Sequence, residues 1–131
     1  MFRLPFDAPA SFFGTQKQVM DYLVHGKSAT SNEFFVAAAL DKLGIDFLFQ
    51  VSYWGGRSLR GGQVLDFLVF NPFEQPVQIF GEFWHEGLLA SKDKLKLAQL
   101  QMIFDTRIIV LWGSETDSYE TAYRTVREKL A

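Results

Sequence analysis

The spacing of apolar and polar positions along the chain predicts helices and strands in a definite order. We expect helices over 15–25, 30–43, 91–104 and 117–130, and strands over 46–52, 64–70, 77–82 and 107–112, with turns at 55–62 and 71–76. The order is α-α-β-β-β-α-β-α. Three sequential strands followed by a helical crossover to a fourth predict an α/β fold, with a mixed β-sheet and helices packed on its faces.

The second helix has the clearest boundaries. Thr30-Ser31-Asn32-Glu33 fits a capping box, in which Thr30 and Glu33 each bond the backbone N–H of the other, and Gly44 follows as a stop signal. The first helix rests on the spacing of Val19, Tyr22 and Leu23, with Gly26 expected to end it.

Length and composition predict one domain. The 131 residues, 48% of them hydrophobic, suffice for a single core, which we divide into an extension with a short helix (1–27), a core (28–116) and a C-terminal helix (117–131). No apolar run approaches the roughly 20 residues that span a bilayer, and the first residues lack the pattern of a signal peptide, so we expect a cytoplasmic protein without membrane contact. The absence of cysteine excludes disulfides and thiolate chemistry.

Charge is nearly balanced overall but uneven along the chain. With 13 basic and 15 acidic residues, the formal charge of −2 argues against coating nucleic acid by bulk electrostatics. Two segments, 53–63 and 91–107, are each locally positive. Their basic residues are Arg57 and Arg60 in the first, and Lys92, Lys94, Lys96 and Arg107 in the second. Solvated loop and helix faces would explain either segment taken alone.

Three polar residues lie in apolar surroundings. Asp66 lies inside a strand, on the same predicted face as Leu68; Glu33 lies at the centre of the apolar stripe of its helix; His85 follows the third strand. Burying an unpaired carboxylate is costly, so Asp66 needs a cation, a metal or a hydrogen-bond donor. The capping box alone would explain Glu33, and a backbone group or an arginine would explain Asp66. Together the three predict a site where the second and third strands open.

The order of these motifs resembles a known nuclease superfamily. Ser31-Asn32-Glu33 opens a helix, a glycine-bracketed loop follows, and then come Asp66-Phe67-Leu68-Val69 and Gly81-Glu82-Phe83-Trp84-His85. Over about 28–116 this resembles the PD-(D/E)XK superfamily, above all its very-short-patch-repair (Vsr) endonuclease branch. The resemblance implies a restriction-endonuclease-like fold and a DNA endonuclease that hydrolyses phosphodiester bonds with Mg²⁺ or Mn²⁺. A homodimer is expected by analogy, since cutting two strands generally needs two sites.

The resemblance also implies roles for individual residues. Asp66 and the Ile79 carbonyl would bind the metal, His85 would help activate water, and Glu33 would support the site. The same resemblance implies that Phe83 and Trp84 form a wedge in the DNA stack. From the residues alone, we expect Trp54 to be exposed in its glycine-rich loop, where it could stack on a base or contact a partner. The basic residues expected to hold phosphates are Arg57, Arg60, Lys92, Lys94 and Lys96. Burial of Phe83 and Trp84 in the core is the competing explanation for that pair.

The third strand departs from the superfamily pattern. Gln78 and Phe80 occupy the positions at which most members carry an acid and then a lysine or acid. Three explanations stay open: a backbone carbonyl and His85 suffice; Glu82 replaces the missing ligand, with one of the three helix lysines reaching in; or the site has degenerated. The last would leave a catalytically inactive nuclease-fold module that binds nucleic acid or a protein partner. Zinc-binding cysteines are also lacking, so mismatch specificity does not carry over.

Overall fold

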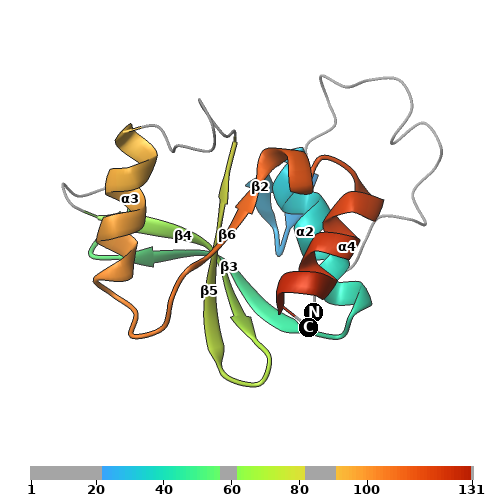
Figure 1. Cartoon of the computed structure of the whole chain (residues 1–131), viewed down its shortest axis with the longest axis horizontal. Helices are drawn as coiled ribbons and strands as arrows, with labels where there is room; N and C mark the ends of the chain where they lie inside the picture. The colour runs from blue at the N-terminus through green and yellow to red at the C-terminus, as the bar shows by residue number, and fades with distance from the viewer. Residues whose placement is uncertain (1–21, 57–61, 82–90, 131) are drawn as a thin grey trace.

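A computed structural model describes residues 22–56, 62–81 and 91–130 (Figure 1). In chain order the described elements are β1 (Tyr22–Val24), β2 (Lys27–Ala29), α2 (Ser31–Lys42), β3 (Asp46–Tyr53), β4 (Gln63–Phe70), β5 (Glu74–Phe80), α3 (Ser91–Gln101), β6 (Ile109–Trp112), the 3₁₀ helix η4 (Gly113–Glu115) and α4 (Tyr119–Leu130). Each helix in this part of the chain is too short or too polar to cross a membrane.

The main sheet is mixed, as predicted. Its order is β3-β4-β5-β6: β4 is antiparallel to both β3 and β5, and β6 runs parallel to β5. The crossover from β5 to β6 carries α3, because a parallel neighbour requires the chain to return to the same end of the sheet. The α/β class with a mixed sheet and covering helices is thus confirmed.

Two hydrophobic clusters flank the sheet. Helices α2 and α4 pack together on one side, and α3 packs on the other (Figure 1). The larger cluster includes Leu40, Phe67 and Val126, and the smaller one joins Leu65 and Leu68 to Leu100 of α3. The sheet is therefore covered on both faces, which explains why β4 is almost wholly apolar.

Helix α2 begins with the capping box that the sequence predicts. The Glu33 N–H donates to Thr30 Oγ1 at 3.1 Å, and the Thr30 N–H donates to Glu33 Oε1 at 2.8 Å. Leu43 is the C-cap, and Gly44 follows at a φ of +73°, a conformation that glycine adopts without steric cost.

The predicted helix over 15–25 is wrong for its described part. Tyr22–Val24 and Lys27–Ala29 form an antiparallel hairpin, while 15–21 lie outside the described residues. His25 and Gly26 form its two-residue turn, with φ values of +51° and +79°. Two successive positive φ values are typical of a tight hairpin turn, so Gly26 reverses a strand here instead of ending a helix. From Tyr22 the order of main elements is β-β-α-β-β-β-α-β-α.

The predicted turn over 71–76 is also too long. Strand β5 starts at Glu74, and Pro76 lies within it, opposite Leu68 of β4. Pairing with β6 begins only at Val77. Pro76 lacks a backbone N–H, and it is tolerated here because it has no partner on the β6 side. The other predicted boundaries differ from the observed ones by only a few residues.

A lysine covers part of each outer edge of the main sheet. On the β3 side, Lys27 Nζ donates to the Phe49 carbonyl at 3.0 Å. On the β6 side, Lys129 Nζ donates to the Val110 carbonyl at 3.1 Å and forms a 2.9 Å salt bridge with Glu115. Both ammonium groups therefore bond carbonyls of edge strands.

Candidate functional site

Strands β4 and β5 pair at one end and separate at the other. Their ladder runs from Phe70 and Glu74 to Phe67 and Val77, where it stops. Beyond that point β4 stays with β3, and β5 stays with β6. Figure 1 shows the two strand pairs leading away from a common crossing region in different directions. We call the opening between them the fork.

Asp66 is the first residue of β4 inside the fork. Among the described strands it has no ladder partner on either side, because the β3–β4 register also omits Gln50 and Asp66. Gln50 has a φ of +53°, which bends β3 at this point. The residue that the sequence singles out therefore lies where both neighbouring ladders are interrupted.

Side chains replace the missing backbone pairing. The Asp66 N–H donates to Gln78 Oε1 at 3.1 Å, and the Ile79 N–H donates to Asp66 Oδ2 at 2.8 Å. Asp66 is 8% exposed and Gln78 is 2% exposed. The predicted bond from Asp66 to a backbone group is present, and Gln78 holds the backbone of the same residue.

The fork also interrupts the alternation of faces along β4. Leu65 and Leu68 both belong to the α3 cluster, whereas Phe67 belongs to the cluster under α2 and α4. Strict alternation would place Asp66 beside Leu68. Its carboxylate accepts from the Ile79 N–H of β5, and its shared face with Leu68 stays a prediction.

A second carboxyl group approaches Asp66 from α2. Burial raises the pKa of Asp66, the bond from the Ile79 N–H lowers it, and Glu33 raises it both as a neighbouring charge and through a side-chain hydrogen bond. The net effect brings the pKa of Asp66 to about 7. Half-buried Glu33 therefore acts in the capping box and at the site together, as the sequence allowed.

One lysine of α3 approaches Asp66 from the other side. The charge of Lys96 lowers the pKa of Asp66, opposing the effect of Glu33. Lys96 is half-buried, whereas Lys92 and Lys94 are exposed. Of the three lysines that the sequence could not separate, Lys96 is therefore the one whose charge acts on the buried carboxyl.

The position of Glu33 depends on a residue to which the sequence analysis gave no role of its own. Asn32 Nδ2 donates to the Gly113 carbonyl at 3.0 Å and to Thr116 Oγ1 at 2.9 Å. These bonds fasten the first turn of α2 to the segment after β6.

The carboxyl groups of Asp66 and Glu33 offer ligands of the kind that a hard cation prefers, but they are only two groups. Glu33 raises the pKa of Asp66, and a divalent cation bound between the two carboxyl groups would favour the charged form of Asp66. Mg²⁺ prefers oxygen ligands. The described residues hold no cluster of three or more His, Cys, Asp or Glu side chains, so the further ligands available among them are a backbone carbonyl, such as that of Ile79, and water. Asp66 already contacts Ile79 through its N–H.

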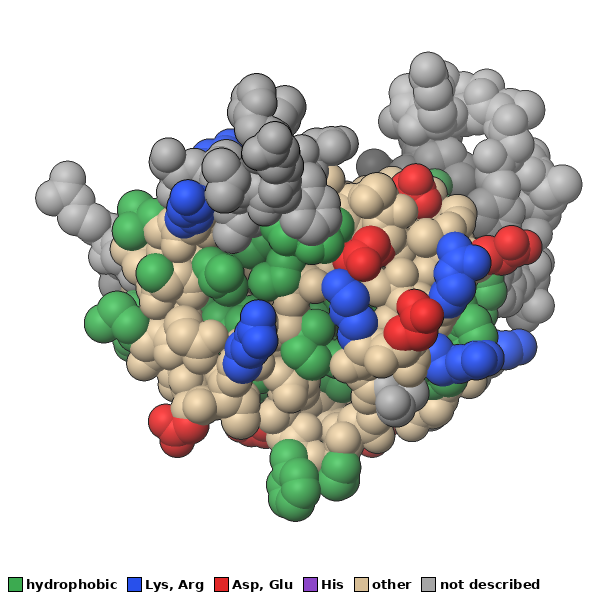
Figure 2. Space-filling model, in the orientation of Figure 1, with side chains coloured by type: hydrophobic (Ala, Val, Ile, Leu, Met, Phe, Trp, Pro, Cys, Tyr) green, Lys and Arg blue, Asp and Glu red, His purple; other side chains and the backbone are tan. Residues whose placement is uncertain are grey.

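Several predicted site residues cannot be placed. Arg57, Arg60, Glu82, Phe83, Trp84 and His85 lie outside the described residues, and their roles stay predictions. Trp54 is described: it is 55% exposed, at a φ of +54° just after β3, which confirms its predicted exposure. Phe80 is buried at the end of β5. On the face shown in Figure 2, basic side chains are separated by acidic and apolar ones and form no single continuous patch.

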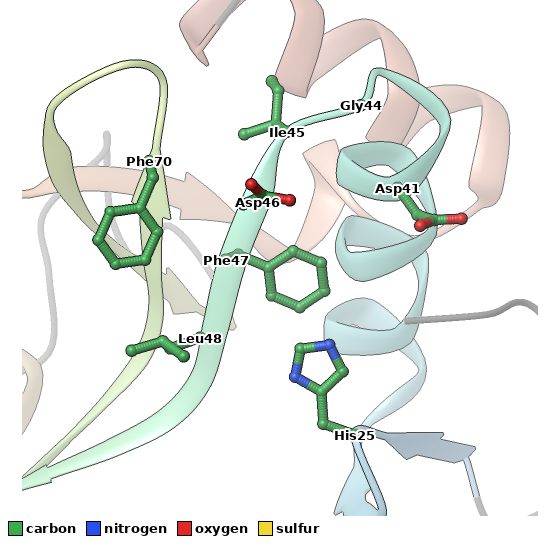
Figure 3. Close-up of a pocket in the computed structure, with 8 residues that line it drawn as sticks. All are labelled: His25, Asp41, Gly44, Ile45, Asp46, Phe47, Leu48 and Phe70. Atoms are coloured by element: carbon green, nitrogen blue, oxygen red, sulfur yellow. The ribbon is translucent and has the colours of Figure 1, made fainter. Parts of the chain in front are cut away.

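A hollow of about 250 Å³ near the start of β3 contains the one histidine that is described (Figure 3). The His25 ring stacks on Phe47 with 4.8 Å between ring centroids and 11° between planes. Burial and the charge of Lys27 lower the pKa of His25, while Asp41 raises it. None of the residues predicted for the nuclease site lines this hollow, and packing on Phe47 accounts for the position of His25.

Comparison with protein-family models, with curated proteins and with solved structures gave no match in any of the three. Function is therefore inferred from the site itself.

Proposed function

We propose that the chain is a Mg²⁺-dependent DNA endonuclease with a restriction-endonuclease-like fold, and that its centre is the fork. The observation that supports this most is the carboxyl pair of buried Asp66 and half-buried Glu33, with Lys96 opposite, at a break in the sheet. Burying one carboxyl group beside another is costly, and a cation bound between them would offset that cost.

Each residue at the fork has a part in the proposed chemistry. Asp66 and Glu33 would hold the cation, with the Ile79 N–H fixing one carboxylate oxygen. A bound Mg²⁺ supplies a Lewis acid and a water of lowered pKa for attack on phosphorus. Lys96 carries a positive charge toward the same place, where it would bind a phosphate oxygen and offset charge that develops during hydrolysis. His85 is proposed, from the sequence, as the proton acceptor.

A second candidate, the catalytically inactive module, is favoured by a separate observation. Gln78 and Phe80 are both buried, and the Gln78 amide oxygen is already occupied by the Asp66 N–H. The side chains of Asp66 and Gln78 thus both bond backbone groups and have a structural role. In this alternative the polar fork is retained for folding, and the protein only binds nucleic acid or a protein partner.

Plasmid cleavage separates the two. Supercoiled DNA is incubated with wild type, Asp66→Asn and the matched control Asp46→Asn, in Mg²⁺, Mn²⁺ or EDTA. Asp46 is exposed on β3, so its variant makes the same Asp-to-Asn replacement without touching the fork. Cleavage by wild type and Asp46→Asn alone, and only with metal, is expected. Equal cleavage by all three proteins would refute the enzyme, and DNA binding without cleavage would favour the module.

A further inference from the structure

A polar hollow lies beside the fork, between the start of β4 and α3. Its volume is about 240 Å³. Lys92, Lys96, Gln63 and Gln99 supply its polar lining, with Val64 and Leu95 as apolar neighbours. No carboxylate belongs to this described lining, so the hollow is positively charged.

The two lysines are placed one helical turn apart, at positions i and i+4 of α3. Like charges at this spacing repel each other. Neither lysine forms a salt bridge with any residue in the described ranges, where Lys129 and Glu115 make the one such pair. An anion bound between the two ammonium groups would relieve this repulsion.

A hydrogen bond between the two glutamines joins the β4 side of the hollow to the α3 side. Gln63 Nε2 donates to Gln99 Oε1 at 2.6 Å, which ties the first residue of β4 to α3. The Gln99 Nε2 group takes no part in that bond and can donate to an anion. Two ammonium groups and a carboxamide N–H are the donors that phosphate oxygens accept from.

We propose that this hollow binds one backbone phosphate of DNA, next to the phosphate that is held at the fork. The inference rests on the proposed function and names a second contact of the same substrate. Lys96 belongs to both places, since it lines the hollow and its charge acts on Asp66. Lys94 lies on the same helix but does not line the hollow. Lys92 is therefore the phosphate contact and Lys94 a solvent-exposed charge.

The test is DNA binding without metal. Anisotropy of a labelled duplex in EDTA is measured for wild type, Lys92→Gln, Lys94→Gln and the distant control Lys42→Gln on α2. Lys92→Gln should weaken binding about tenfold, as expected for a hydrogen bond to a charged group, and should lower the salt dependence by about one phosphate contact. Lys94→Gln should have a clearly smaller effect. Circular dichroism confirms folding, and Gln99→Leu should also weaken binding without changing the charge.

The outcomes are distinct from those of the cleavage test. Equal weakening by Lys92→Gln and Lys94→Gln would overturn the proposal, because general charge on α3 would then suffice. Inorganic phosphate that binds wild type while DNA affinity is the same for wild type and Lys92→Gln would also overturn it. If Lys92→Gln specifically weakens DNA binding but wild type cleaves no plasmid, the phosphate contact is supported and the nuclease activity is refuted.

Discussion

The two ends of the β4–β5 pair are built from the same strands in opposite ways. At the hairpin end, backbone groups pair with each other and Phe67, Val69 and Val77 are wholly buried. At the fork, the side chains of Asp66 and Gln78 bond backbone groups of the opposite strand. In this sheet, the buried carboxyl lies where the ladder is interrupted, and it takes over part of the backbone hydrogen bonding there.

The fork has an energetic basis that is independent of any activity. A buried backbone N–H without an acceptor costs about 1–3 kcal/mol. Gln78 supplies that acceptor to Asp66, and Asp66 supplies one to Ile79. Each of these two polar side chains therefore satisfies the backbone of the opposite strand.

The largest effect is expected at the hairpin end. Phe67 packs against Phe47 and Phe49, with ring centroids 5.5 and 5.2 Å away. Phe67→Ala should lower the free energy of unfolding by about 3–5 kcal/mol because it leaves a cavity in the core. The control, Phe73→Ala, removes a ring that is 83% exposed and should change stability by less than about 0.5 kcal/mol. Urea denaturation measures both; a loss below about 1 kcal/mol for Phe67→Ala would contradict the packing.

The next effect is the pH dependence of stability that Asp66 causes at the fork. The pKa of Asp66 rises from its ordinary value of 3.8 to about 7 on folding, so the folded protein binds a proton that the unfolded chain has released. The contribution of Asp66 to stability is therefore complete below pH 4 and is lost as the pH rises to about 7, by at most about 4 kcal/mol. Asp66→Asn should abolish this fall and exceed wild type in stability at pH 8. Urea midpoints between pH 4 and 8 measure it, and parallel curves for both proteins would rule it out.

The smallest effect is expected at Gln78. Its variants separate its role as a hydrogen-bond acceptor from its place at a proposed metal site. Gln78→Leu removes the acceptor of the Asp66 N–H and should cost about 1–3 kcal/mol. Gln78→Glu keeps an acceptor and adds a carboxylate beside Asp66 and Glu33, so it should lower the melting temperature in EDTA and regain part of the loss in Mg²⁺. Thermal melts with and without Mg²⁺ test this pair. If Mg²⁺ raises the melting temperature of neither wild type nor Gln78→Glu, the fork does not bind the ion.

Local signals were enough for most of the fold. The capping box of α2 depends on residues three apart, and the mixed sheet follows from the order of strands and crossover helix. The β1–β2 hairpin was missed because a glycine after a short apolar segment is compatible with a helix end as well as a turn. The deciding fact, the positive φ of His25 together with Gly26, is not visible in residue type.

The sequence indicated some of the residues at the fork, but not the contacts between them. Asp66 and Glu33 were found because each contradicts the apolar pattern around it. Their contact joins α2 to β4, and the bond between Asp66 and Gln78 depends on where β4 and β5 separate. Lys96 differs from Lys94 only by its angle around α3, so spacing alone could not choose between them.

The lysines at the two sheet edges have a consequence for the behaviour of the protein in solution. A strand of a second molecule could extend the sheet only by displacing Lys27 from the Phe49 carbonyl or Lys129 from the Val110 carbonyl. Each displacement would break a hydrogen bond of a charged group, and the incoming strand would meet an ammonium group instead of open backbone. These two side chains thus oppose amyloid-like growth of a sheet whose strands are unusually rich in phenylalanine, valine and leucine.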